Sequence, residues 1–108
     1  NSLAQALENI LRNAIRHSPP DGIVSLSGQR EGDRWHLWLD DQGAGVAPEE
    51  LERIFAPFTR LDGSRPGDGG FGLGLSIARN ALRLQGGSLW AENTGQGLRV
   101  HLMLASRL

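Results

Sequence analysis

The sequence contains no cysteine and no lysine, and no apolar run in it approaches the length of a membrane-spanning helix. The lack of cysteine excludes disulfides and thiolate metal sites. All eleven basic residues are arginines, and the formal net charge of −1 argues against a nucleic-acid-binding surface. We find no signal-peptide pattern and no internal repeat. The 108 residues suffice for one domain with a small core, and because the chain opens on a helical pattern at Asn1 we expect it to be a piece of a longer protein.

A glycine-rich stretch at residues 67–75 is the most distinctive local feature, since five of its nine residues are glycine. A helical pattern follows over residues 73–85, with an apolar stripe of Leu73, Ile77, Ala81 and Leu84. A glycine loop that runs into a helix N-terminus can bind an anion through its free backbone N–H groups. The stretch is therefore either a phosphate-binding loop or a glycine-rich surface linker. It lacks the Lys-Ser/Thr of a P-loop, and no strand precedes it as a dinucleotide fingerprint requires.

The first predicted helix, residues 2–17, carries an unusual polar face. Asn9 and Asn13 are one turn apart, and Arg16 falls on the same face. Asparagine is a poor helix former, so two on one face suggest a need for neutral oxygen ligands or amide hydrogen bonds. From the helix alone, an ordinary solvated face is the preferred interpretation.

Alternating patterns predict two hairpins, with strands at residues 23–29 and 34–40 and at residues 88–93 and 98–104. His36 and His101 are interpreted as ordinary strand-surface residues, since neither has a partner at metal-ligand spacing.

The first hairpin ends in Asp40-Asp41-Gln42-Gly43-Ala44-Gly45, which predicts a tight turn that holds a carboxylate. Such a carboxylate could serve acid–base chemistry or a metal, or it could accept a hydrogen bond from a ligand amine. A plain Asp/Gly loop is the remaining alternative.

A short helix is expected at residues 48–55, followed by a segment at 61–72 that we expect to be mobile. The element order is then helix, two strands, short helix, lid, helix and two strands. This order predicts a two-layer α+β sandwich with helices covering one face of a sheet.

Four motifs in this order resemble the nucleotide-binding boxes of sensor histidine kinases. They are E-N-I-L-R-N-A-I-R-H-S at residues 8–18, D-x-G-x-G at 41–45, I-F-A-P-F-T-R at 54–60 and G-x-G-L-G-L at 70–75. The chain is thereby similar, over nearly its whole length, to the catalytic and ATP-binding domain of these kinases, within the wider GHKL group. The resemblance implies one Bergerat-type domain at 1–108, truncated at its N-terminal edge, with a mixed sheet and an ATP lid at about 56–72.

The resemblance also implies a role for individual residues. Asn13 would bind Mg²⁺, Asn9 and Arg16 would lie near the phosphates as catalytic residues, and Asp41 would accept a hydrogen bond from the adenine amine. Gly43 and Gly45 would make room for the adenine, Phe55 and Phe58 would anchor the lid, and Arg60 would approach the phosphates. The triphosphate would be cradled by Gly70, Phe71, Gly72, Leu73, Gly74 and Leu75.

Three positions depart from the family pattern. His17 stands where tyrosine is frequent, and its charge would depend on pH. Thr59 occupies a position that is often aromatic, and Phe71 replaces a small hydroxyl residue.

The activity implied is that of an ATP·Mg²⁺-binding protein-histidine kinase domain, which presents the γ-phosphate to a histidine on a separate dimerisation domain. None of the three histidines is identifiable as the phosphate acceptor, so the fragment should not phosphorylate itself. A GHKL-type ATPase is the first rival, but it needs a glutamate where Asn9 stands, and Glu8 lies about 100° around the helix. A domain that only binds a partner protein is the second.

The expected partners are ATP or ADP, the dimerisation domain and, indirectly, a response regulator, with no nucleic acid. The fragment is expected to be a monomer and a cytoplasmic part of an inner-membrane sensor in a bacterium.

Overall fold

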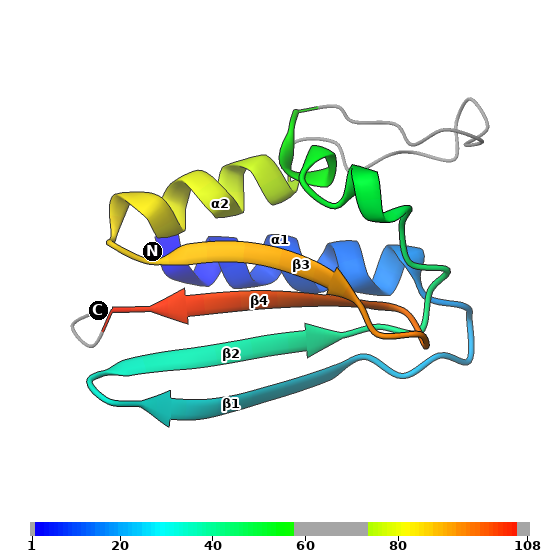
Figure 1. Cartoon of the computed structure of the whole chain (residues 1–108), viewed down its shortest axis with the longest axis horizontal. Coiled ribbons are helices and arrows are strands. Elements are labelled where there is room, and N and C mark those ends of the chain that lie inside the picture. The colour runs from blue at the N-terminus through cyan, green and yellow to red at the C-terminus, as the bar shows by residue number, and fades with distance from the viewer. Residues whose placement is uncertain (1, 58–73, 106–108) are drawn as a thin grey trace.

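The chain folds as two layers, a four-stranded sheet with two α-helices lying side by side against one of its faces (Figure 1). The computed structural model describes residues 2–57 and 74–105. The helices are α1 (Ser2–His17) and α2 (Gly74–Leu84), and the strands are β1 (Ser25–Glu31), β2 (Arg34–Asp40), β3 (Ser88–Asn93) and β4 (Leu98–Leu104). The predicted two-layer α+β sandwich is confirmed.

The strands follow the order β1-β2-β4-β3, and each described pairing is antiparallel. The expectation of a mixed sheet is therefore not met by these four strands. Both hairpins pair their own strands, and the long-range pairing of β2 with β4 joins the two hairpins into one sheet.

The core lies between the helices and the inner face of the sheet. On α1, buried Ala6, Ile10 and Ala14 recur every four residues, as one helix face requires. The buried apolar residues of the sheet are Leu39, Leu89, Leu98, Val100, Leu102 and Leu104. Fully burying a leucine or isoleucine side chain contributes about 1.5–3 kcal/mol, so this interface holds the helices on the sheet.

The helix expected over residues 73–85 is confirmed as α2, but only part of the apolar spacing that indicated it packs against the core: Ala81 does so, and Leu73 lies outside the described residues. The helix buries Leu75, Ala78 and Leu82, whereas Ile77 is 50% exposed and Leu84 is 80% exposed. Both sets recur at helical spacing, so periodicity alone could not decide which of two adjoining apolar faces packs against α1 and the sheet.

None of the helices in residues 2–57 and 74–105 combines the length and apolarity needed to cross a membrane.

The first hairpin is shifted relative to the prediction of a strand at 23–29. Ser25 pairs with Asp40, the last residue of β2, so residues 23 and 24 lie beyond the ladder. The Ile23 amide instead donates to the Gln42 side-chain oxygen at 2.9 Å. The turn contains only Gly32 and Asp33, and Gly32 adopts a φ of 67°, which glycine tolerates without steric cost.

The short helix expected at residues 48–55 is divided into two 3₁₀ turns, η1 (Pro48–Glu50) and η2 (Arg53–Phe55). Backbone amides in these turns donate hydrogen bonds to carbonyls three residues earlier, as the Ala56 amide does to the Arg53 carbonyl at 2.9 Å. A segment this short gains little from α-helix propagation, which favours single tight turns.

Candidate functional site

Two of the sequence motifs, the helix motif of α1 and the D-x-G-x-G turn, meet at one end of the sheet. There α1 ends, β2 ends and β4 begins (Figure 1). The Asp41 amide donates to the Leu98 carbonyl at 3.0 Å, which fixes the residue after β2 against the first residue of β4.

The Asp41 side chain is 6% exposed and is held by backbone amides. Its Oδ1 accepts hydrogen bonds from the Gly43 amide at 2.9 Å and from the Leu98 amide at 3.0 Å. Within the described part of the chain, Oδ2 accepts no hydrogen bond, so one carboxylate oxygen is committed to the fold and the other is available to a ligand. Two charge-assisted backbone bonds orient this acceptor before any ligand arrives.

Glycines let the turn after Asp41 pack closely on its neighbours. A side chain at Gly43 would overlap the His17 carbonyl oxygen at the end of α1. Gly45 has a φ of 74°, and the next residue, Val46, bonds to Asn93 through both its amide (3.0 Å) and its carbonyl (2.6 Å). Asn93 thus fastens the turn to the β3–β4 hairpin.

Gly97 supports the site from the opposite side, because a side chain there would overlap the Asp41 carbonyl. The roles of Gly97, Asn93 and the Leu98 amide were not predicted, since these residues lie more than fifty positions from Asp41 in the sequence. The one available signal was the glycine just before the last strand, which reads equally well as a hairpin residue.

Alanine at Gly97 should therefore push the β4 backbone away from Asp41. We expect Gly97→Ala to cost about 1–3 kcal/mol of stability by overpacking and to weaken ATP binding. The control is Gly95→Ala at the hairpin tip, where φ is 87° and the added carbon meets nothing within 4 Å. It should lose about 1–2 kcal/mol through backbone strain while it keeps its ATP affinity. Denaturant unfolding and calorimetric ATP titration measure both quantities, and equal ATP affinities for the two variants would contradict this account.

The α1 residues proposed for the phosphates share the face seen in the sequence. Asn13 is 8% exposed, Asn9 is half-buried and Arg16 is exposed. A Cβ at Gly74, the first residue of α2, would lie 3.7 Å from the Asn9 Cβ, so the N-terminus of α2 faces this part of α1. A buried asparagine side chain is costly unless its amide finds partners, which weighs against the ordinary solvated face for Asn13.

His17 ends α1 beside the turn that follows Asp41. Burial, together with the adjacent Arg16 guanidinium, lowers the pKa of His17 below its ordinary value of 6.5, although the Asp41 carboxylate partly opposes this. At neutral pH the imidazole is therefore uncharged, and it would meet a phosphate as a neutral hydrogen-bond donor rather than as a cation.

Phe55 of η2 is buried, and the Arg79 guanidinium of α2 lies 4.5 Å from the centre of its ring. The same guanidinium pairs with Glu52 at 2.9 Å. Arg79 thus binds η2 to α2 through a cation–π contact and an ion pair, a role that was not predicted from the sequence.

Several predicted site residues lie outside the described residues. These are Phe58, Arg60, Gly70, Phe71, Gly72 and Leu73, with Thr59 and most of the proposed lid. Gly74 and Leu75 are described, and Leu75 is a buried core residue.

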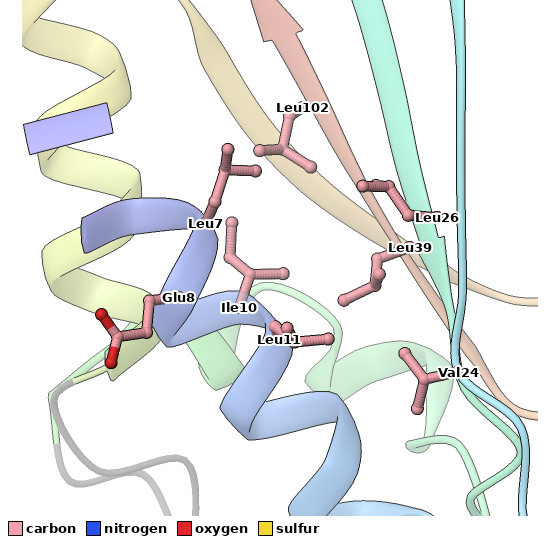
Figure 2. A pocket seen from close by; sticks show the side chains of 8 residues that line it. All are labelled: Leu7, Glu8, Ile10, Leu11, Val24, Leu26, Leu39 and Leu102. Carbon is pink, nitrogen blue, oxygen red and sulfur yellow. The ribbon is translucent and has the colours of Figure 1, made fainter. Parts of the chain in front are cut away.

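A cavity of about 330 Å³ lies elsewhere, between α1 and the β1–β2 hairpin (Figure 2). Seven of its eight lining side chains are aliphatic, so it offers no group for phosphate or adenine recognition. The eighth, Glu8, turns its carboxylate away from the aliphatic residues in Figure 2 and pairs with Arg12 at 2.6 Å. No group of three or more histidine, cysteine, aspartate or glutamate side chains that could hold a metal ion occurs in residues 2–57 and 74–105.

Comparison with known proteins places the chain in a family. The family model described as histidine kinase-, DNA gyrase B-, and HSP90-like ATPase matches residues 1–107. The sensor protein PfeS of Pseudomonas aeruginosa is 67% identical over 104 residues, which cover 96% of this chain and 23% of PfeS. The chain thus spans about a quarter of that relative's length.

Solved structures agree with the sequence comparison. The mycobacterial sensor histidine kinase MprB matches with a TM-score of 0.83 at 30% identity, over 96% of this chain and 72% of the MprB chain. Full-length ShkA in complex with AMPPNP matches with a TM-score of 0.79 at 30% identity, over 97% of this chain and 21% of ShkA. The chain belongs to the family of histidine kinase-, DNA gyrase B- and HSP90-like ATPases, and its relatives include sensor histidine kinases.

Proposed function

We propose that this chain is the ATP-binding catalytic domain of a two-component sensor histidine kinase. It binds Mg-ATP and presents the γ-phosphate to a histidine on a separate dimerisation domain, from which a response regulator is then phosphorylated. The observation that carries the proposal is the Asp41 carboxylate, with Oδ1 fixed by two backbone amides and Oδ2 left for a ligand amine. Support comes from the sensor histidine kinase relatives, of which ShkA is described with bound AMPPNP.

Adenine recognition follows from the chemistry of Asp41. A carboxylate oxygen only accepts hydrogen bonds at neutral pH, so it selects a base that presents an amine. Adenine presents an amine at C6, whereas guanine presents a carbonyl oxygen at that position. Gly43 and Gly45, which have no side chains, are proposed to make room for the adenine.

The donors on α1 suit a magnesium-bound triphosphate. The buried Asn13 side chain offers a neutral, hard oxygen of the kind that Mg²⁺ accepts. The metal, when bound, neutralises charge on the phosphates. Asn9 and the exposed Arg16 lie on the same helix face, where Arg16 can donate charge-assisted hydrogen bonds to phosphate oxygens. Catalysis then rests on positioning and charge neutralisation.

The lid is proposed to comprise residues 56–72, with Phe58 and Arg60 approaching the nucleotide. The glycine loop with Gly70, Phe71, Gly72 and Leu73 is proposed to continue through Gly74 and Leu75 into α2. Phe55 anchors the start of this segment through its contact with Arg79.

We further propose that the domain is the cytoplasmic part of a bacterial membrane sensor, in keeping with its relatives, and that the isolated domain is monomeric.

The rival ATPase function lacks a base to activate water. An amide cannot take a proton, and amides occupy both positions, 9 and 13, on the phosphate-facing side of α1. Glu8 is more than half exposed and is paired with Arg12. The nucleotide boxes are intact in sequence at Asn13 and Asp41, which argues against a domain that only binds a partner protein.

Calorimetric titration of this chain with nucleotides tests the proposal. ATP should bind in the presence of Mg²⁺, more weakly in EDTA, and GTP should bind poorly under both conditions. No binding of ATP with or without Mg²⁺ would favour the protein-interaction rival. Steady release of inorganic phosphate by the isolated chain would instead favour the ATPase.

A further inference from the structure

The face of the sheet opposite the helices carries a continuous chain of four hydrogen-bonded side chains. Glu31 Oε2 lies 2.8 Å from His36 Nδ1, and His36 Nε2 lies 2.8 Å from His101 Nδ1. The last member, Glu92, contacts His101 Nε2 through its own Oε2 at 2.5 Å. The order Glu31–His36–His101–Glu92 crosses the whole sheet from β1 through β2 and β4 to β3. Both histidines were interpreted as ordinary surface residues, and for His101 this is wrong, since it is 7% exposed.

Aromatic rings cover the middle of this chain. Trp90 stacks on His101 with ring centres 4.9 Å apart and planes 2° apart, and its ring lies 5.6 Å from that of His36. Trp38 lies 5.0 Å from His36. The His36 side chain is 15% exposed and that of His101 is 9% exposed, whereas both carboxylates reach solvent. The contact between the imidazoles is therefore shielded from water, while its two ends are wet.

The three contacts fix the number of protons on the four ring nitrogens of His36 and His101. An ionised carboxylate only accepts hydrogen bonds, so His36 Nδ1 and His101 Nε2 must each carry a proton. The nitrogens that face each other, His36 Nε2 and His101 Nδ1, form a hydrogen bond only if one of them carries a proton and the other does not. Three protons on four ring nitrogens satisfy all three contacts, and the histidine pair then bears one positive charge.

Any other count breaks a contact. With two protons, both neutral imidazoles either face each other with lone pairs or leave a carboxylate opposite a lone pair. With four protons, two N–H groups point at each other within a water-excluded contact, and the two positive charges repel.

The neighbouring charged groups do not substitute for this proton. Arg99 on β4 is engaged with Asp40 on β2 through two hydrogen bonds of 2.6 and 3.1 Å, and its charge also acts on Glu92. Gln29 on β1 donates to Glu31 at 2.8 Å. Arg34 on β2 is exposed and lies opposite Glu31 in the β1–β2 pairing, so it adds a positive charge at the solvent-exposed Glu31 end of the hydrogen-bonded chain.

We propose that the Glu31–His36–His101–Glu92 chain holds one shared proton between its two histidines and thereby acts as a pH-sensitive lock across all four strands. All three hydrogen bonds of the chain form while the histidine pair carries three protons. At least one of them is lost when the pair loses its shared proton or gains a fourth. This property concerns the stability of the sheet and does not depend on the proposed kinase function.

Stability against pH is the first test. Unfolding of this chain by urea should show a maximum of stability at intermediate pH and a fall on both sides. On the alkaline side, loss of the shared proton should lower the folding equilibrium constant by about tenfold, as expected for a charge-assisted hydrogen bond. On the acidic side, Glu31 adds to the fall, since bonds from Gln29 and His36 lower its pKa below the ordinary 4.5. A carboxyl with a lowered pKa stabilises the fold above that ordinary value and loses its contribution as pH falls.

Two variants distinguish a pH-dependent role of the shared proton from a contribution of these side chains to packing alone. His101→Leu removes the group that shares a proton with His36, so the alkaline fall should shrink to that of the remaining His36–Glu31 pair. Glu92→Gln alters only the solvent-exposed end and should shift the alkaline fall to lower pH, because the shared proton loses a stabilising charge. Glu49→Gln is the control, because Glu49 is exposed and is not one of the four hydrogen-bonded residues. It should leave the dependence of stability on pH unchanged. An equal loss of stability at every pH in both test variants would overturn the proposal.

The imidazole ¹⁵N spectrum supplies an independent test, which the presence of only three histidines makes simple to assign. The proposal requires a protonated Nδ1 on His36, a protonated Nε2 on His101 and one further proton lost in a single step by the pair. Two independent titrations, each ending in its own neutral tautomer, would contradict it. The profile should also be unaffected by EDTA, whereas its loss on chelation would assign the contact to a metal ion instead.

Discussion

Replacing Asn13 by alanine should remove the Mg²⁺-dependent part of ATP binding while leaving part of the affinity intact. The amide oxygen is the proposed metal ligand, and alanine offers none. Adenine recognition through Asp41 lies on a different element, so metal-free binding should persist. In the intact kinase that contains this chain, phosphoryl transfer should fall by about 10²-fold or more, because the metal supplies several kcal/mol of charge stabilisation.

A second asparagine provides the matched control for this experiment. Asn80 lies on the exposed side of α2, so Asn80→Ala makes the same chemical change away from the proposed site. Alanine should favour either helix by up to about 0.7 kcal/mol on intrinsic propensity. ATP titrations with Mg²⁺ or EDTA and autophosphorylation assays would be run on both variants. If Asn13→Ala behaves like Asn80→Ala in both assays, the metal role is removed.

Replacing Asp41 by asparagine should weaken ATP binding by about 10- to 100-fold and leave the fold nearly unchanged. The backbone amides of Gly43 and Leu98 both donate to Oδ1, so the asparagine must place its carbonyl oxygen there. Its NH₂ group then occupies the position of Oδ2 and opposes the adenine amine, donor against donor. The loss corresponds to about 1.5–3 kcal/mol for a hydrogen bond to a charged group.

The neighbouring residue gives the control. Asp40→Asn removes a carboxylate that pairs with Arg99 on the other side of β2, so it should reduce stability slightly and leave ATP affinity unchanged. Asp41→Ala should lose both affinity and stability, because two backbone amides are left without their acceptor. A parent chain that binds ATP and GTP equally, or Asp41→Asn with parental ATP affinity, would contradict the assignment of Asp41.

The sequence predicted the order and type of nearly every described element, because long alternating or helical patterns are strong signals. The bounds of β2, β3 and β4 were correct, and α1 was placed without error. The errors arose where tertiary contacts decide. The register of β1 is set by the end of β2, and the buried face of α2 is set by its packing against α1, and neither can be found in one segment's own periodicity.

The candidate site was predicted through motifs, whereas its supporting contacts could not be. Asp41 and Asn13 stand in recognisable patterns, but Asn93, Gly97 and Arg79 act through partners far away in the sequence. The histidine pair shows the same limit most clearly. His36 and His101 are 65 residues apart, and only the pairing of β2 with β4 brings their ring nitrogens together.

The pairing of β2 with β4 also has a consequence for how the domain folds. The Asp41–Leu98 bonds join residues 57 apart in sequence, whereas each hairpin closes over a few residues. Closing a long loop costs more chain entropy than closing a short one, so the hairpins can form early while the junction between them comes late. The proposed nucleotide site lies at that junction. A partly folded chain therefore has no half-formed site with partial affinity, and a bound nucleotide would stabilise only the fully assembled sheet.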